Sequence, residues 1–157
     1  MKKILLGIIF PTSLFFSCKN NNNPSSSEVA KTINRTVACY LYAMNNDTIQ
    51  LKLARIADSV YGTLNYLPYE KDARTGIFNE GKWNGDTLFV NYLSSQEGQD
   101  SDCEMAILRS GTNLVLTNDI WEDANYRYNE TYSKGFFKDK SKISFKGDTL
   151  IAVHCKD

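Results

Sequence analysis

Short runs in which apolar and polar residues alternate, separated by turn sequences, constrain the fold of this chain more than any other feature. Ile49, Leu51 and Leu53 alternate with Gln50 and Lys52. Because side chains of an extended strand point to opposite faces in turn, this run forms a strand with one apolar and one polar face. The same period of two recurs along the chain, whereas helical spacing of apolar residues is scarce. The sequence therefore predicts an all-β domain.

Similar runs mark strands from residue 36 almost to the C-terminus. Asn84-Gly85 is a strong hairpin signal, and Pro68 ends a strand because proline cannot donate to a ladder. The segment 118–141 is irregular, with room for a short helix. The predicted strands cover 36–44, 49–53, 60–67, 76–83, 88–92, 101–109 and 114–117, followed by a final hairpin of 143–145 with 150–155 across the turn 146–148.

Tight turns between successive strands predict an antiparallel meander of about eight strands. A sheet of this size removes its exposed edges by closing on itself or by folding over. We therefore expect a closed or nearly closed β-barrel, similar to the calycins, with a two-sheet sandwich as the alternative. The sequence leaves open whether the barrel interior is filled or hollow.

The N-terminal residues have a different composition from the rest of the chain. Two lysines precede an apolar run from Ile4 to Phe16, which is too short for the roughly 20 residues of a membrane-spanning helix. With the small Ser17 before Cys18, this pattern predicts a secretory signal peptide over 1–17. The polar Asn- and Ser-rich tract that follows predicts a disordered tether over 18–33, and a single domain over 34–157.

The end of the apolar run resembles the lipobox of bacterial lipoproteins. Ser17 and Cys18 match it, whereas Phe15 and Phe16 are bulkier than usual, as in lipoproteins of Bacteroidota. The resemblance implies that Cys18 carries a palmitate-containing lipid anchor. Lys19 resembles the outer-membrane sorting pattern, which implies an outer-membrane anchor with the domain in the periplasm, or alternatively at the cell surface.

Three cysteines besides Cys18 follow the export signal, so pairing in an oxidising compartment is expected. Cys39 lies in the first predicted strand and Cys155 in the last, and these strands are neighbours in a closed meander. We therefore expect a Cys39–Cys155 disulfide at the seam. Cys103 alternates with Met105 and Ile107, which predicts a buried, unpaired thiol.

Several phrases of the domain resemble small lipoproteins of Bacteroidota, a family that carries no agreed activity. The resemblance implies an envelope location and a single domain. A lipid anchor, a small barrel and a disulfide are also similar to the membrane-bound lysozyme inhibitors, whose Ser-Gly-containing loop is not evident here. The matching phrases are Cys39-Tyr40, Asp47-Thr48, Gly62-Thr63-Leu64-Asn65-Tyr66, Glu70-Lys71-Asp72, Gly85-Asp86-Thr87-Leu88 and Glu97-Gly98.

Charge and residue counts exclude several classes of function. The chain has 18 basic and 18 acidic residues, and loss of residues 1–17 removes two lysines, which leaves a net charge near −2. Such a charge provides no field for nucleic acid. His154 is the only histidine and no Cys-x-x-Cys occurs, so we expect no metal site and no cofactor. We expect a monomer.

Two sets of carboxylates are candidates for chemistry. Asp100, Asp102 and Glu104 share one face of a strand and could resemble a calcium site. An EF-hand loop that starts at Asp100 would need Gly at its sixth position and Glu at its twelfth, but these positions hold Met105 and Gly111. A solvated outer face is the better interpretation. A scattered set could supply a pair for glycoside cleavage, and this set comprises Glu70, Asp72, Glu80 and Glu97. For His154, packing or exposure at the rim is expected in place of catalysis.

An aromatic-rich stretch near the C-terminus is the candidate binding surface. Aromatic faces beside amides and charges suit sugar or peptide recognition, and the alternative is that these residues cover the end or edge of the barrel. Its members are Trp121, Tyr126, Arg127, Tyr128, Tyr132 and Phe136.

Together these features predict a protein that is not an enzyme: a lipid-anchored envelope module that binds a small ligand, glycan or protein. The alternative is an inhibitor of a cell-wall-degrading enzyme. A glycoside hydrolase that uses the carboxylates is the least favoured hypothesis.

Overall fold

The computed structural model describes residues 34–117, 125–130 and 133–156. The predicted signal peptide, the lipidation residue Cys18 and the tether over 18–33 lie outside the described residues. Within the described ranges, no helix is long and apolar enough to span a membrane.

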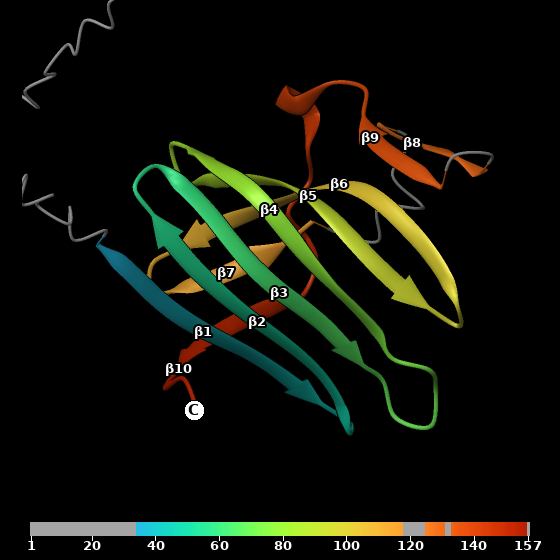
Figure 1. Ribbon diagram of the computed structural model, residues 1–157, viewed down its shortest axis with the longest axis horizontal. Helices are drawn as coiled ribbons and strands as arrows, with labels where there is room; N and C mark the ends of the chain where they lie inside the picture. The colour runs from blue at the N-terminus through green and yellow to red at the C-terminus, as the bar shows by residue number, and fades with distance from the viewer. Residues whose placement is uncertain (1–33, 118–124, 131–132, 157) are drawn as a thin grey trace, which may run out of the picture. The chain divides into compact units, whose positions relative to one another are not determined.

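The described domain consists almost entirely of β-strands, as the alternating pattern predicts (Figure 1). One short 3-10 helix, η2 (Lys140–Lys142), precedes the last strand. The strands are β1 (Arg35–Met44), β2 (Asp47–Ile56), β3 (Ser59–Leu67), β4 (Arg74–Asn84), β5 (Thr87–Gln96), β6 (Gln99–Ser110), β7 (Asn113–Leu116), β8 (Tyr126–Asn129), β9 (Lys134–Phe137) and β10 (Thr149–Val153).

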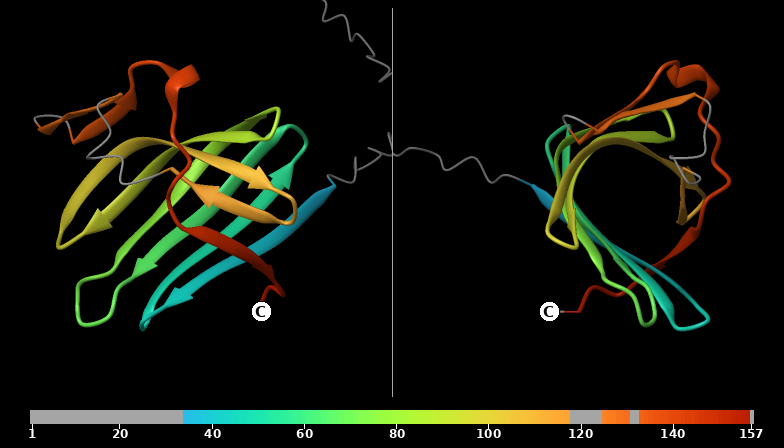
Figure 2. Two further views of the ribbon diagram at one scale, coloured as in Figure 1. Left: turned by 180° about the vertical axis from the view of Figure 1, so that it is seen from behind. Right: turned by 90° about the vertical axis from the view of Figure 1, so that its right-hand side faces the viewer.

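Eight of these strands form a closed antiparallel barrel, which confirms the predicted all-β fold and excludes the two-sheet sandwich. The strand order is β5-β4-β3-β2-β1-β10-β7-β6, and β6 pairs again with β5. The right-hand view of Figure 2 shows this ring. Because each of β1 to β6 pairs with the next strand along the chain, only β10 has to return from a distance, between β7 and β1, to close the ring.

The seam where β10 closes the barrel differs from the predicted C-terminal hairpin. β10 pairs with β1, where Cys39 lies opposite Val153, and with β7. Residues 143–145 form no strand, so the predicted hairpin of 143–145 with 150–155 is wrong. Ile143 and Phe145 are apolar because they pack, together with Phe89, against a small cluster outside the barrel. This cluster consists of Ala106, Tyr126 and Phe137.

The predicted disulfide between Cys39 and Cys155 is present at this seam, with a Cα–Cα distance of 5.2 Å. It joins β1 to the residues just after β10. Cys103 is free and only 2% exposed, as its alternation with Met105 predicts. The disulfide therefore reinforces the contact between the first and last strands of the ring.

Inward-facing aliphatic and aromatic side chains fill much of the barrel. Ile49, Leu51 and Leu53 are buried, whereas Gln50 and Lys52 between them are exposed. The largest fully buried side chains are those of Phe78, Leu51, Leu64, Leu88, Ile107, Leu114, Leu150 and Val60.

A glycine makes room for the largest of these side chains. A Cβ on Gly62 would lie 2.5 Å from the Phe78 ring and 2.5 Å from the Lys52 carbonyl oxygen. The aromatic ring of Phe78 therefore occupies space that any other residue at position 62 would require.

Two short strands lie outside the barrel, where the sequence predicted an irregular segment. β7 is short and pairs with β6 only from Ile107 onward, which leaves the first half of β6 with one unpaired edge. β9 pairs with that edge in parallel, with Asp102 opposite Lys134, and β8 pairs with β9. The short length of β7 therefore determines where the β8–β9 pair joins the sheet.

Carboxylates on the outer face of β6 hold β9 and the residues that follow it against the barrel. Asp102 forms an ion pair with Lys134 at 3.4 Å, and Glu104 forms one with Lys140. Glu104 also accepts a hydrogen bond from the backbone N–H of Phe137 at 3.1 Å. The prediction of a solvated face is therefore right for the exposed Asp100 and wrong for the partly covered Asp102 and Glu104.

Candidate functional site

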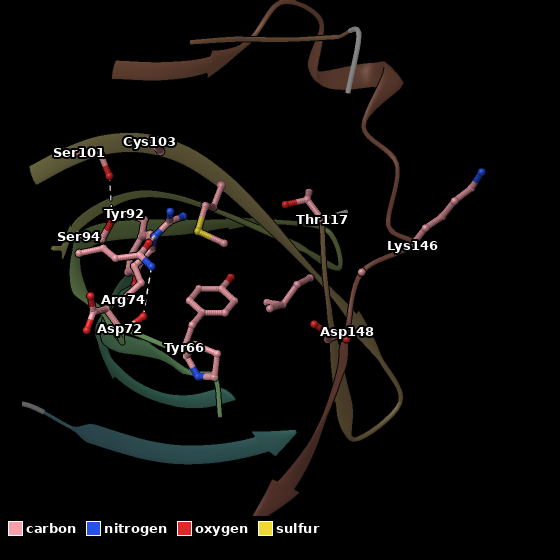
Figure 3. A pocket seen from close by; sticks show the side chains of 15 residues that line it. Tyr66, Asp72, Arg74, Tyr92, Ser94, Ser101, Cys103, Thr117, Lys146 and Asp148 are labelled. Carbon is pink, nitrogen blue, oxygen red and sulfur yellow. Dashed lines mark hydrogen bonds between the residues drawn. The ribbon is translucent and has the colours of Figure 1, made fainter. Parts of the chain in front are cut away.

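A cavity of about 470 Å³ lies inside the barrel at one end, which we call the mouth. This end gathers the last residues of β1, β3, β5 and β7 and the first residues of β2, β4, β6 and β10. The volume is within the range of about 300–1,000 Å³ typical of sites for small molecules. The lining residues are Tyr66, Pro68, Asp72, Arg74, Tyr92, Ser94, Gln96, Ser101, Cys103, Met105, Leu116, Thr117, Lys146, Gly147 and Asp148 (Figure 3).

The inner part of the cavity is apolar and rigid. Tyr92 is buried among Met105 and Leu116, and its hydroxyl donates to the Leu64 carbonyl oxygen at 2.7 Å. Burial raises the pKa of Tyr92, although Arg74 and a hydrogen bond with Ser94 oppose the shift. Tyr92 therefore stays neutral and serves as part of the apolar floor.

A polar network covers the wall formed by β4, β5 and β6. The Nε of Arg74 donates to Oε1 of Gln96 at 2.9 Å, and the Gln96 amide donates in turn to the Asp72 carbonyl oxygen at 3.2 Å. The hydroxyls of Ser94 and Ser101 are 2.9 Å apart. These bonds fix a guanidinium and two hydroxyls at the lining of the cavity (Figure 3).

The opposite wall is formed where the chain passes β7 before it enters β10. The Gly147 N–H donates to the Leu116 carbonyl oxygen, and a Cβ at Gly147 would lie 2.5 Å from the Thr117 carbonyl oxygen. Only glycine therefore permits this close approach. The Leu116 N–H donates to the Asp148 carbonyl oxygen at 3.0 Å, which fixes Asp148 beside the cavity.

Two polar side chains on this wall face the cavity. Thr117 is 9% exposed, and its hydroxyl has no hydrogen-bond partner among the residues that the structure describes. Figure 3 shows this hydroxyl directed toward the cavity. Burial and then the charge of the nearby Asp148 carboxylate raise the pKa of Tyr42, so these two side chains interact at the cavity wall. Leaving a buried hydroxyl without a partner costs about 1–3 kcal/mol, so Thr117 favours a polar occupant.

The predicted aromatic surface is divided by the fold. Tyr126 is buried and packs edge-on against Phe137, with ring centroids 5.1 Å apart, so it covers the outer side of β6 at Ala106. Tyr126 therefore cannot present an open face to a ligand. Arg127 and Phe136, which are paired across β8 and β9, are exposed.

The remaining members of that surface lie elsewhere. Tyr128 is half-buried on β8, and Trp121 and Tyr132 lie outside the described residues. The part of the surface that the structure describes as exposed is thus the Arg127–Phe136 pair.

The other sequence candidates are not gathered at one place. Glu70, Glu80 and Glu97 are exposed and adopt positive φ angles of 56°, 59° and 53°, typical of turns and bulges. Of the four scattered carboxylates, Asp72 alone lines the mouth cavity. His154 is exposed beyond β10. In the described part of the chain, no three histidine, cysteine or carboxylate side chains could hold a metal ion together.

Apart from Asp72, the candidates from the sequence did not include the polar residues of the mouth cavity. Ser94 lies two residues after the buried Tyr92, and Ser101 lies two residues before the buried Cys103. Alternation therefore places both serines on the inward face of the barrel, where an apolar core residue would be expected. A polar residue at an inward position near a strand end is the signal that could have revealed the site.

Comparisons with protein-family models, curated proteins and solved structures gave no match for this chain. Function therefore has to be inferred from the chemistry of the cavity.

Proposed function

We propose that this protein is a non-enzymatic binding module that holds a small polar ligand in the mouth cavity. The observation that carries the proposal is the buried Thr117 hydroxyl, which lines a cavity of about 470 Å³ and has no partner among the described residues. An apolar floor with a few fixed polar groups is the usual composition of a small-molecule site. The guanidinium of Arg74, the Ser94–Ser101 pair and Asp148 supply such groups.

The proposal includes attachment of the domain to the cell envelope. The lipobox-like sequence supports a lipid anchor at Cys18, and the polar tract behind it supports a tether that lets the domain act in the periplasm. A domain on such a tether would keep its ligand near the membrane, although the domain itself would not have to contact the membrane. Inhibition of a cell-wall-degrading enzyme stays a prediction from the sequence.

The binding proposal is tested by nuclear magnetic resonance of the isotope-labelled domain. The probes are D-glucose, N-acetylglucosamine, succinate and the tripeptide Gly-Leu-Gly. We expect at least one probe to shift the backbone resonances of mouth residues in a saturable manner. No saturable shift with any of the probes would overturn the proposal.

A pair of matched variants locates the binding. Ser101→Phe places a ring in the cavity lining, and Ser110→Phe makes the same change at the exposed far end of the same strand, β6. We expect Ser101→Phe to abolish the shifts and Ser110→Phe to preserve them. Shifts that persist in a folded Ser101→Phe variant would contradict binding in the mouth.

A further inference from the structure

The mouth cavity has opposite charges on opposite walls. In the ring of eight strands, β4 and β10 are four steps apart in either direction, so they face each other across the barrel. Arg74 is the first residue of β4, and Asp148 immediately precedes β10. Figure 3 shows the two side chains on opposite sides of Tyr66. A ligand that spans the mouth therefore meets a cation at one end and an anion at the other.

Both charges are held in place by neighbouring residues. The bond from Arg74 Nε to Gln96 orients the guanidinium. Asp148 is held by the bond from the Leu116 N–H to its backbone carbonyl oxygen, and its carboxylate interacts with Tyr42. Fixed charges bind an ionic ligand group better than mobile ones because less side-chain entropy is lost on binding. Guanidinium groups suit carboxylates in particular, since the planar fork matches both oxygens.

The cavity lining contains two other charged side chains, and both are exposed. Lys146 is exposed, and its side chain extends away from the cavity in Figure 3. Asp72 is exposed at the rim. Water screens exposed charges strongly, so Arg74 and Asp148, both half-buried, dominate the field inside the cavity.

Between the two charges lies a surface suited to an uncharged ligand body. Tyr92, Met105 and Leu116 form its apolar part, and the Thr117 hydroxyl offers one hydrogen bond at its side. A backbone amide with a small apolar side chain would satisfy both features.

We propose that the mouth cavity binds a short linear zwitterion, of the di- or tripeptide class, with its carboxylate at Arg74 and its ammonium group at Asp148. This inference rests on the proposed binding function and assigns the ligand class to the same cavity. The amide and side chain of the ligand lie over the apolar floor beside Thr117.

The test measures the affinity of Gly-Leu-Gly and two analogues by isothermal titration calorimetry. N-acetylation removes the ammonium charge, and C-terminal amidation removes the carboxylate charge. We expect each analogue to bind about tenfold more weakly than the parent peptide, because each loses one charge-assisted hydrogen bond. Equal affinity of all three peptides would overturn the assignment.

Variants then connect each peptide end to one wall. In Arg74→Gln, amidation should no longer weaken binding, whereas acetylation still should. In Asp148→Asn the pattern should be reversed. Lys71→Gln is the matched control, because Lys71 is an exposed lysine in the loop between β3 and β4 at the same end of the barrel and is not part of the cavity lining, so it should preserve both effects.

Two results separate this inference from the proposed function. If glucose, N-acetylglucosamine or succinate binds in the mouth while Gly-Leu-Gly does not, the proposed binding function stands and the assignment of a zwitterionic peptide as the ligand is wrong. If an Arg74→Gln protein that retains its circular dichroism spectrum still discriminates against the amidated peptide, the assignment of the carboxylate to Arg74 is wrong.

Discussion

Removal of the seam disulfide tests how the barrel is closed. The ring is weakest where β10 enters it, because β10 pairs with β1 at three register positions and with β7 at two. Every other neighbouring pair in the ring has a longer register. The double variant Cys39→Ala/Cys155→Ala removes the covalent link beside this short ladder.

The size of the effect follows from the chain length that the disulfide encloses. Cys39 and Cys155 are 116 positions apart in the sequence. In the chain-entropy model, a link over that distance lowers the entropy of the unfolded chain by about 16 cal/mol/K, which stabilises the fold by about 5 kcal/mol at 25 °C. For a domain of about 125 residues, this corresponds to a decrease in Tm of about 15–20 °C when the link is lost.

Urea unfolding of the wild-type and variant proteins measures the difference. We expect the free energy of unfolding to fall by about 5 kcal/mol, and the slope with urea to increase because the unlinked chain exposes more surface when it unfolds. Wild-type protein in reducing agent should behave as the variant does. Cys103→Ala is the control for loss of a buried thiol, with an expected cost of about 1 kcal/mol. A double variant no less stable than this control would refute the reasoning.

Three further predictions concern single residues. Gly62→Ala should lower the free energy of unfolding by about 1–3 kcal/mol, because its Cβ would overlap the Phe78 ring; an unchanged urea midpoint would contradict this packing. Tyr92→Phe removes the hydrogen bond from the Tyr92 hydroxyl to the Leu64 carbonyl oxygen and should cost about 1–2 kcal/mol. The pKa of Tyr92 is raised in the fold, so the neutral side chain contributes stability that is fully present below about pH 10 and is lost as the pH rises further. Tyr92→Phe lacks this ionisable group, so above pH 10 its free energy of unfolding should decrease less than that of the wild-type protein. Urea unfolding at several pH values measures the difference. Finally, Cys18→Ala should abolish incorporation of labelled palmitate, and label that persists in this variant would contradict the anchor.

The barrel and its disulfide could be predicted because the relevant signals are local. Alternation and turn residues fix a strand and its apolar face within a few residues, as at Ile49 to Leu53. A meander then brings its first and last strands together, which placed Cys39 beside Cys155. The same reasoning failed for 143–145, because alternation records which side chains are buried and does not distinguish a strand from a segment that packs against the outside of the barrel.

The candidate site could be predicted only in part. The aromatic stretch was recognised by composition, but composition does not distinguish the buried Tyr126 from the exposed Phe136. The difference arises because β9 adds to the edge of β6 that the short β7 leaves unpaired.

By itself, the sequence determined the barrel strands β1 to β7, their inward faces and the pairing of each with the next, since these depend on residues close together in the chain. The tertiary structure alone decided which polar residues meet at the mouth. Arg74 and Asp148 are 74 positions apart, and they oppose each other only because the ring closes through β10. Which residues face each other across the ring depends on the order and register of strands that are distant in the chain, so no local pattern in the sequence records that pairing.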